Sequence, residues 1–327
     1  MNILVTGGAG YIGSHTSLAL IDKGHNVTII DNLITGNVKA IPDKASFLNS
    51  DIADLQKINA LLDENKFDLI MHFAGLVRVE ESFEEPNKYK INNIDKAKTF
   101  FDCCISRGLN KIIFSSTAGV YGKLKDNIKL NETDKLDPSN PYAKTKLELE
   151  KYLLNLKDQN KIKYIILRYF NVAGADKEKR SGLMSKNSNN LIKVVCEVAT
   201  KKREKIIING NDYKTTDGTA VRDFIHVSDL ADIHVIVADH LVSNKESGIY
   251  NCGYGTGYSV KQVVKTMEQI LNKDLNNELG PRRDGDIPYS VANNEKFKNK
   301  FNWSPKYNDL NYILSSALNW ENYINDL

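Results

Sequence analysis

Short hydrophobic runs alternate with longer amphipathic segments through the first half of the chain. Runs typical of buried strands occupy residues 2–6, 27–30, 69–73, 111–115 and 163–168. Helices are expected between them, at residues 11–23, 55–64, 87–107 and 141–156. In the second of these, apolar residues recur at 55, 58, 61 and 62, which is the spacing of one helix face. This alternation predicts an α/β fold of the Rossmann type, a doubly wound parallel sheet with helices on both faces.

The pattern changes from about residue 176. Loops become longer and richer in Asn, Asp and Gly, as in 177–190 and 209–219; a strand predicted at 206–208 stands isolated, and 280–288 is expected to form an ordered loop. We therefore expect a Rossmann domain over residues 1–175 and a smaller C-terminal α/β substrate domain over 176–327, with some segments returning to the sheet. Open α/β folds bind ligands at the carboxyl ends of their strands, so the second domain is expected over that edge.

A glycine-rich turn follows the first predicted strand. Gly7, Gly10 and Gly13 satisfy the pattern Gly-x-x-Gly-x-x-Gly, and the turn opens the first predicted helix. Such glycines let the backbone approach a pyrophosphate at the helix amino terminus, where free N–H groups favour negative charge. Asp31 ends the next strand, where its carboxylate would accept from a ribose 2′-hydroxyl and repel a 2′-phosphate. The motif predicts NAD rather than NADP as the cofactor.

Tyr142 and Lys146 lie at positions i and i+4 of a predicted helix and therefore share one face. A free tyrosine has a pKa of about 10 and is no base at neutral pH. A fixed ammonium group and a positively charged nicotinamide would stabilise the phenolate and lower that pKa. Thr117 ends the fourth predicted strand, and its hydroxyl could hydrogen-bond the same substrate oxygen. These three residues form the candidate catalytic set.

The composition excludes several other classes of protein. The 327 residues are 41% hydrophobic and 26% charged, which rules out wholesale disorder and suffices for one large domain or two ordinary ones. The formal net charge of +3 is too small to argue for a nucleic-acid partner, which needs a clustered basic face. The densest basic stretch, residues 201–205, is interrupted by Glu204 and is expected to be a solvated helix end.

Membrane, disulfide and metal chemistry find no support in the sequence. No segment approaches the roughly 18–20 apolar residues of a membrane span, and the first strand begins without a basic leader. Four cysteines without a Cys-x-x-Cys pair are too few for a disulfide framework, and the six histidines lack metal-binding spacing. We expect a cytoplasmic, metal-free protein with reduced thiols and no membrane partner.

Further segments make the resemblance to a known family specific. The glycine turn, Asp31 and the Tyr–Lys pair resemble the extended short-chain dehydrogenase/reductase superfamily, and the remaining segments resemble the UDP-glucose 4-epimerases within it. These segments span nearly the whole chain: GYIGSH at 10–15, DNL at 31–33, HFAGL at 72–76, LRYFN at 167–171, NNL at 189–191, GNDY at 210–213, DGT at 217–219, VRDFIHV at 221–227 and PRRDGD at 281–286.

The resemblance implies NAD as cofactor and a UDP-sugar as substrate. Besides the three glycines, the implied cofactor-binding residues are Tyr11, Ile12, Asp31, Asn32, Asp51, Ile52, Phe73, Ala74, Gly75, Asn92, Thr117, Tyr142, Lys146 and Phe170. The implied substrate-binding residues are Thr117, Tyr142, Asn171, Asn190, Leu191, Arg222, Arg283, Asp286 and Ser290. Two guanidinium groups suit a diphosphate, and the carboxylate of Asp286 would accept from a ribose hydroxyl.

The chain departs from the family pattern at three positions. Val77 replaces a lysine that often reaches the cofactor; Arg78 follows it, and the sequence leaves open whether Arg78 takes over that contact. Asn209 replaces an aromatic residue often found near the uracil, which would leave the base held more by polar contacts. Thr117 stands where serine is commoner and keeps the hydroxyl group.

The reaction implied by the resemblance is inversion at C4 of a UDP-hexose, which interconverts UDP-glucose and UDP-galactose through a transient 4-keto sugar. Family members restricted to these sugars carry a tyrosine where this chain has Ser290. A small residue there would leave room for an N-acetyl group, so we also expect interconversion of UDP-N-acetylglucosamine and UDP-N-acetylgalactosamine. The opposing interpretation is that the neighbouring Tyr289 closes the gap.

Three alternative functions and the oligomeric state also follow from the comparison with the family pattern. A nucleotide-sugar 4,6-dehydratase needs an Asp-Glu pair after the threonine, where this chain has Ala118 and Gly119, which cannot transfer protons. A UDP-uronic acid 4-epimerase and a catalytically inactive NAD-binding regulatory protein remain as alternatives. The family also implies a homodimer, in which the helices at 87–107 and 141–156 pack against their mates as a four-helix bundle.

Overall fold

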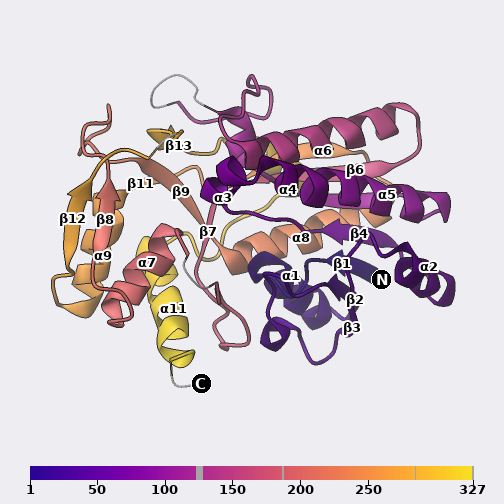
Figure 1. Cartoon of the computed structure of the whole chain (residues 1–327), viewed down its shortest axis with the longest axis horizontal. Coiled ribbons are helices and arrows are strands. Elements are labelled where there is room, and N and C mark those ends of the chain that lie inside the picture. Colours follow the sequence, from indigo (N-terminus) through magenta and orange to yellow (C-terminus); the bar gives the residue numbers. More distant parts are fainter. Residues whose placement is uncertain (123–127, 186–187, 284, 326–327) are drawn as a thin grey trace. The chain divides into compact units, whose positions relative to one another are not determined.

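The structure is a computed structural model that describes residues 1–122, 128–185, 188–283 and 285–325 (Figure 1). The chain forms two compact units that interleave along the sequence. Unit 1 comprises Met1–Gly122, Lys135–Arg168 and Ala231–Tyr250. Unit 2 takes in the described residues of 123–134, 169–230 and 251–327. Cofactor binding by one domain and substrate binding by the other remain predictions from the sequence.

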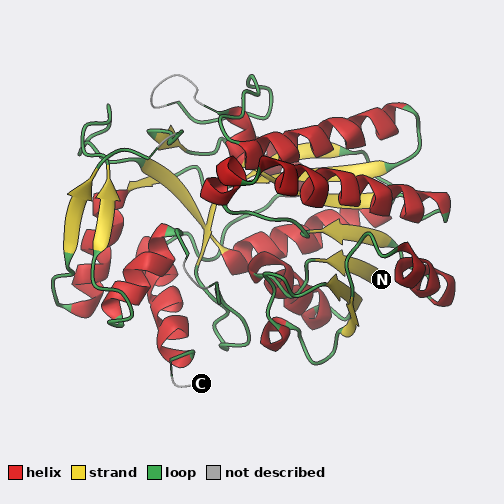
Figure 2. Cartoon of the chain, viewed as in Figure 1, coloured by secondary structure: helices red, strands yellow, loops and turns green. Residues whose placement is uncertain are grey.

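Unit 1 is built around a seven-stranded sheet in the order β10-β6-β5-β4-β1-β2-β3 (Figure 2). Strands β1 to β5 pair in parallel. This order, which reverses beside β1, confirms the predicted Rossmann-type fold. The strands are β1 (Asn2–Thr6), β2 (Asn26–Asp31), β3 (Ser46–Asn49), β4 (Leu69–His72), β5 (Lys111–Thr117), β6 (Lys163–Tyr169) and β10 (Gly248–Cys252). The helices are α1 (Tyr11–Asp22), η1 (Val38–Ala40), α2 (Leu55–Glu64), α3 (Val79–Glu84), α4 (Pro86–Lys90), η2 (Ile91–Asp95), α5 (Lys96–Ser106), η3 (Ala118–Tyr121), α6 (Pro141–Asp158) and α8 (Val227–Val242).

Both faces of this sheet are apolar because its strands are covered by helices. Leu4, Ile30, Ile70 and Ile112 form one buried cluster with residues of α2, α5 and α6. Their neighbours Ile3, Ile29, Met71 and Ile113 are equally buried. Successive residues of a strand point to opposite faces, so this second set lies on the other face, where α1 contacts β1 and β2. The continuous hydrophobic runs in the sequence reflect this burial on two sides.

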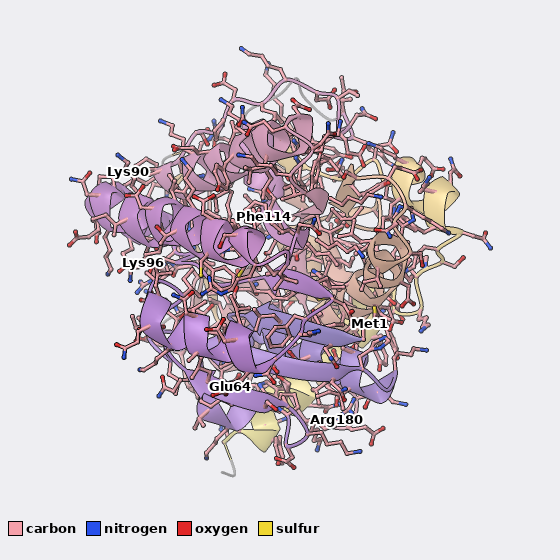
Figure 3. The ribbon with its side chains drawn as sticks, turned by 90° about the vertical axis from the view of Figure 1, so that its right-hand side faces the viewer. Met1, Glu64, Lys90, Lys96, Phe114 and Arg180 are labelled. Atoms are coloured by element: carbon pink, nitrogen blue, oxygen red, sulfur yellow. The ribbon has the colours of Figure 1, made fainter. Side chains whose placement is uncertain are left out.

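The segment predicted as one long helix at 87–107 is helical from Pro86 to Ser106 and contains a π-helical turn. Helices α4 and α5 are joined by the π-helical turn η2, which Lys90 and Lys96 bracket in Figure 3. The predicted helix is confirmed, but the π-helical turn inside it was not predicted; there the side chain of Asn93 hydrogen-bonds the main chain of Leu76, outside the helix. Hydrophobic periodicity does not encode such a bond. Strands β3 and β10 were not predicted either; β3 is a short edge strand with largely exposed residues.

Unit 2 contains a four-stranded sheet and a separate two-stranded one. The larger sheet has the order β11-β9-β13, with β7 also paired to β9, and the smaller pairs β12 with β8. The strand expected to stand alone at 206–208 is β8, which pairs in parallel with β12. The strands are β7 (Asn171–Ala173), β8 (Ile206–Asn209), β9 (Val221–His226), β11 (Gly257–Ser259), β12 (Asn277–Gly280) and β13 (Tyr289–Ser290), and the helices are α7 (Leu191–Ala199), α9 (Val260–Leu271), α10 (Glu295–Phe301) and α11 (Leu310–Tyr323).

The loops predicted at 177–190 and 280–288 lie only partly within the described residues, since 186, 187 and 284 fall outside them.

The basic stretch at 201–205 follows the end of α7. Its side chains pair with acids: Lys202 with Glu321 at 2.9 Å, and Arg203 with Glu197 at 2.9 Å. Within the described residues, no helix is long and apolar enough to cross a membrane.

His72, the last residue of β4, is a buried histidine at the centre of unit 1. Its Nδ1 lies 2.8 Å from the hydroxyl of Thr6, and its ring contacts Phe100, Phe101 and Phe114. Burial, with a smaller contribution from the charge of Lys146, lowers the pKa of His72 to about 3. The imidazole is therefore neutral in the folded protein at all physiological pH values.

This burial predicts a specific acid sensitivity. Below pH 6.5 the unfolded chain binds a proton at His72 that the folded chain does not, so the free energy of unfolding falls as the pH falls. The loss contributed by this one group reaches about 2 kcal/mol at pH 5. Denaturant titrations should show a steeper fall between pH 6.5 and pH 5 for the wild type than for His72→Gln. Equal slopes in the two proteins would contradict the assignment.

Candidate active site

The residues predicted to bind the cofactor gather at the carboxyl edge of the sheet in unit 1. Parallel registers set Thr6 beside Ile30 and His72, and His72 beside Phe114, so the strand ends are level. Just at or beyond these ends lie Gly7, Gly10, Tyr11, Ile12 and Gly13 after β1, Asp31 and Asn32 after β2, Asp51 and Ile52 after β3, Phe73, Ala74 and Gly75 after β4, and Thr117 on β5. Open α/β proteins bind their ligands at this edge.

The glycine turn between β1 and α1 is packed as a dinucleotide-binding turn requires. Gly7 has φ +73°, and a Cβ atom there would lie 2.5 Å from the Ala74 nitrogen. A Cβ atom on Gly13 would lie 2.3 Å from the Gly7 carbonyl oxygen. Helix α1 begins at Tyr11; its N-cap residue, Gly10, provides no side-chain cap, and its first turn contains no acidic residue. Its N–H groups therefore suit an anion such as a pyrophosphate, and these residues fit NAD.

Two carboxylates shape the loops that follow β2 and β3. Asp31 accepts hydrogen bonds from the backbone nitrogens of Ala9 at 3.0 Å and Leu33 at 2.9 Å, and its burial raises its pKa. A carboxylate has about four acceptor positions, so capacity for a ribose hydroxyl is left. Asp51 pairs with Lys96 at 2.6 Å and accepts from Asn32 at 3.2 Å. Burial opposes the ionised form of Asp51, but these hydrogen bonds and the charge of Lys96 hold its pKa below the ordinary value.

Helix α6 places the candidate catalytic residues against the end of β5. The helix begins at Pro141, and the side chain of Asn140 caps it by accepting from the Ala143 nitrogen at 2.8 Å. The Thr117 hydroxyl lies near Tyr142 and favours its ionised form. One helical turn later, Lys146 donates to the Ser115 carbonyl oxygen at 2.9 Å. The predicted set of Thr117, Tyr142 and Lys146 is thus brought to one place.

The charged forms of Tyr142 and Lys146 are both disfavoured by burial. Burial raises the pKa of Tyr142 to about 12, although the nearby Thr117 hydroxyl acts in the opposite direction. Burial lowers the pKa of Lys146 to about 8, although the negative charge of Glu150 acts in the opposite direction. The Lys146 ammonium also lies 5.0 Å from the centre of the Phe114 ring. Proton abstraction by Tyr142 therefore needs further positive charge, which a nicotinamide ring would add.

Asn93, which the sequence did not single out, connects the β4 loop to helix α6. Its side chain accepts from the Leu76 nitrogen at 2.8 Å and donates to the Leu76 oxygen at 2.9 Å. It also donates to the hydroxyl of Thr145 at 3.2 Å, next to Lys146. The predicted cofactor residue Asn92 donates to Asn93 in turn, at 3.1 Å. The sequence signal for Asn93 was a pair of adjacent asparagines in the middle of a predicted helix, because asparagine is a poor helix former.

In unit 2, the residues predicted to hold the substrate centre on strand β9. Asn171 of β7 pairs with Phe224, and Ser290 of β13 pairs with Arg222. The Arg222 guanidinium lies 2.5 Å from a carboxylate oxygen of Asp286. Arg222 and Asp286, which are predicted to hold a phosphate and a ribose, thus pair with each other, and each keeps further hydrogen-bonding capacity.

The other predicted substrate residues are placed separately. Asn190 caps α7, accepting from the Lys193 nitrogen at 3.2 Å, and Leu191 is the first residue of that helix. Arg283 is exposed beside Asp284, which lies outside the described residues. Phe170, predicted near the nicotinamide, belongs to unit 2, where its nitrogen donates to the Cys252 oxygen at 3.1 Å.

Two of the three departures from the family pattern, at Val77 and Asn209, are described by their exposure and their hydrogen bonds. Val77 is 59% exposed. Both the backbone nitrogen and the oxygen of Arg78 bind the Tyr89 hydroxyl, which fixes this residue at the start of α3. The side chain of Asn209 donates to the Ile207 oxygen at 3.2 Å.

A Rossmann sheet whose carboxyl edge carries a glycine turn, an acidic residue after β2 and a Tyr–Lys pair on one helix face defines an NAD-dependent α/β enzyme. Residues 3–253 match the NAD dependent epimerase/dehydratase family. The chain belongs to this family.

Individual relatives cover nearly the whole chain. A UDP-glucose 4-epimerase of Azospirillum brasilense is 41% identical over 319 residues, which are 98% of this chain and 91% of the relative. The crystal structure of a Stenotrophomonas maltophila UDP-glucose-4-epimerase with bound NAD and formylated UDP-arabinopyranose superposes with a TM-score of 0.96 at 33% identity, covering 100% and 99% of the two chains. The UDP-Glc/GlcNAc 4-epimerase of Campylobacter jejuni has a TM-score of 0.85 at 41% identity, covering 98% and 99%.

Proposed function

We propose that this protein is an NAD-dependent UDP-hexose 4-epimerase that interconverts UDP-glucose and UDP-galactose. The observation that supports this most is that Lys146 is fixed to Ser115 near the end of β5, one helical turn from Tyr142, at the edge that holds the glycine turn. The activities named for its relatives support the same substrate class. The residue roles that follow are part of this proposal.

Tyr142 is the base that takes the proton from the sugar 4-hydroxyl and later returns it. The ammonium of Lys146 stabilises the phenolate, and Thr117 donates a hydrogen bond to the reacting oxygens. Bound NAD supplies the acceptor and donor of hydride for C4 of the sugar. Arg222, Arg283 and Asp286 hold the UDP, so that the 4-keto sugar turns about its bond to the phosphate and presents its other face.

The sequence after Thr117 keeps the reaction from becoming an elimination. Ala118 and Gly119 follow it in the short helix η3. Neither side chain transfers protons, so no acid or base is supplied from these positions for the sugar C5 and C6. The intermediate keto sugar is therefore returned to a hexose and is not dehydrated.

Replacing the base tests this proposal. Tyr142→Phe removes the proton acceptor, and turnover of UDP-galactose should fall by about 10³-fold. Each chain should still release close to one NAD on denaturation, because the glycine turn is untouched. The matched control is Tyr152→Phe on the same helix, whose hydroxyl bonds Asp102 at 2.5 Å and which should keep wild-type turnover.

The wild type also decides between the alternatives. Conversion of UDP-galacturonate without conversion of UDP-galactose would make the protein a uronate epimerase. NAD retained without turnover of either sugar would favour the regulatory protein.

We further propose that the enzyme accepts N-acetylated sugars. Ser290 is a small residue on β13, beside Arg222 of β9. Tyr289 precedes it in the same strand, and neighbouring residues of a strand point to opposite faces. This geometry argues against the alternative that Tyr289 fills the space left by serine. The dual activity named for the Campylobacter jejuni relative supports the same specificity.

A matched pair of substitutions tests this specificity. Ser290→Tyr adds a ring of about the volume of an acetamido group, and it should abolish conversion of UDP-N-acetylgalactosamine while UDP-galactose is still converted. Ser290→Ala keeps the space and should keep both activities. Product analysis by chromatography separates the four sugars. A wild type that converts UDP-galactose readily and no N-acetylated sugar would refute this proposal.

The proposed assembly is a homodimer in the cytoplasm. Helix α6 packs with α4 and η2 inside unit 1, and in the proposed dimer these helices also pack against their mates as a four-helix bundle. The location rests on the cysteine content of the sequence. Light scattering at micromolar concentration should give about twice the chain mass of 36.8 kDa. A single species at the chain mass would contradict the dimer.

A further inference from the structure

Three consecutive residues of β5 are held by three successive turns of helix α6. Thr117 lies near Tyr142, the Ser115 carbonyl oxygen accepts from Lys146 at 2.9 Å, and the Ser116 hydroxyl donates to Glu150. The helix residues are spaced at i, i+4 and i+8, so they form one stripe that faces the end of the strand. The first two contacts involve the candidate catalytic pair, and the third involves a residue to which the proposed mechanism gives no role.

Glu150 is itself locked from the next strand. Its side chain is 1% exposed and forms a two-pronged pair with Arg168 of β6, with distances of 2.6 Å and 3.1 Å. Arg168 is 2% exposed, donates to the Tyr121 hydroxyl at 3.0 Å and lies 4.9 Å from the centre of that ring. Burying two charges is costly unless their geometry is good and their remaining hydrogen bonds are satisfied. This network meets both conditions with groups from β5, β6, α6 and η3.

We propose that Glu150, fixed by Arg168, is a positioning residue for the catalytic pair: it holds α6 in register on β5 and places a buried negative charge one helical turn from Lys146. The inference rests on the proposed epimerase function, in which Lys146 must carry its charge. Glu150 acts through Lys146 and Ser116. The proposal gives it no contact with the reacting atoms.

The groups around Lys146 define the direction of the effect. From β4 it faces His72, which is neutral, and from β5 it faces the Phe114 ring and the Ser115 carbonyl oxygen. On its own helix it faces Tyr142 and Glu150. Burial lowers the pKa of Lys146 to about 8, and the negative charge of Glu150 opposes that fall. Removing the charge therefore lowers the pKa further, and Lys146 loses its proton at a lower pH.

The test is the pH dependence of kcat for UDP-galactose in Glu150→Gln, measured on the NAD-bound protein. Glutamine keeps the size and a hydrogen-bond acceptor but removes the charge. The alkaline limb of the profile should move to lower pH by about one unit. The matched control is Glu148→Gln, two residues away on the same helix, where the exposed carboxylate pairs with Lys98 at 3.0 Å. The control profile should coincide with that of the wild type.

A second variant covers the case in which Glu150→Gln leaves Arg168 unpaired and fails to fold. Glu150→Gln combined with Arg168→Met removes both buried charges, and replacing a whole buried pair is tolerated far better than breaking it. Its alkaline limb should also move down, because the charge that faces Lys146 is the carboxylate.

The outcomes separate this inference from the proposed function. An alkaline limb that stays at the wild-type position in a folded, NAD-bound variant overturns the role of Glu150, even if stability or kcat falls. A wild type that does not convert UDP-galactose at any pH overturns the epimerase proposal itself. A shifted limb in the Glu150 variants and an unshifted one in Glu148→Gln support the inference.

Discussion

The buried ammonium group of Lys146 is the constraint on which the rest of the site depends. Lys146 is 3% exposed, and loss of water favours the neutral amine. The surroundings oppose this with a carbonyl oxygen, an aromatic face and a carboxylate, which come from β5 and from the helix itself. Because the carboxylate of Glu150 is also buried, it needs Arg168 from β6. The Lys146 cation thus belongs to a buried polar network with groups from α6, β5, β6 and η3.

The same constraint explains why the catalytic residues lie on regular elements and not on loops. Tyr142 is held near the first turn of α6, behind a proline and an asparagine cap, and Thr117 is the last residue of β5. A strand and a helix fixed to each other at consecutive residues leave little freedom for the phenol relative to the ammonium. Rigid placement of this kind is what proton transfer at a defined atom requires.

Much of this could be predicted from the sequence, because it depends on local patterns. Runs buried on two sides gave the parallel strands, and the i, i+4 spacing put Tyr142 and Lys146 on one face. The glycine turn was recognisable from its spacing. Gly7 and Gly13 are required there because a Cβ atom at either position would clash with neighbouring backbone atoms. The long-range features were not predictable. The π-helical turn contains Asn93, whose side chain bonds the distant Leu76, and the return of residues 231–250 to unit 1 depends on tertiary packing. Glu150 gave no signal, since a glutamate in mid-helix is ordinarily exposed.

In the proposed mechanism Tyr142 works as a phenolate, although burial in the protein alone raises its pKa to about 12. The most direct measurement is a spectroscopic titration of phenolate absorbance in the NAD-bound protein, taken as the difference between the wild type and Tyr142→Phe. The difference in phenolate absorbance should correspond to one tyrosine that ionises near neutral pH, because Lys146 and the cofactor supply the positive charge. A difference that shows Tyr142 ionising only above about 10, the pKa of a free tyrosine, would contradict it.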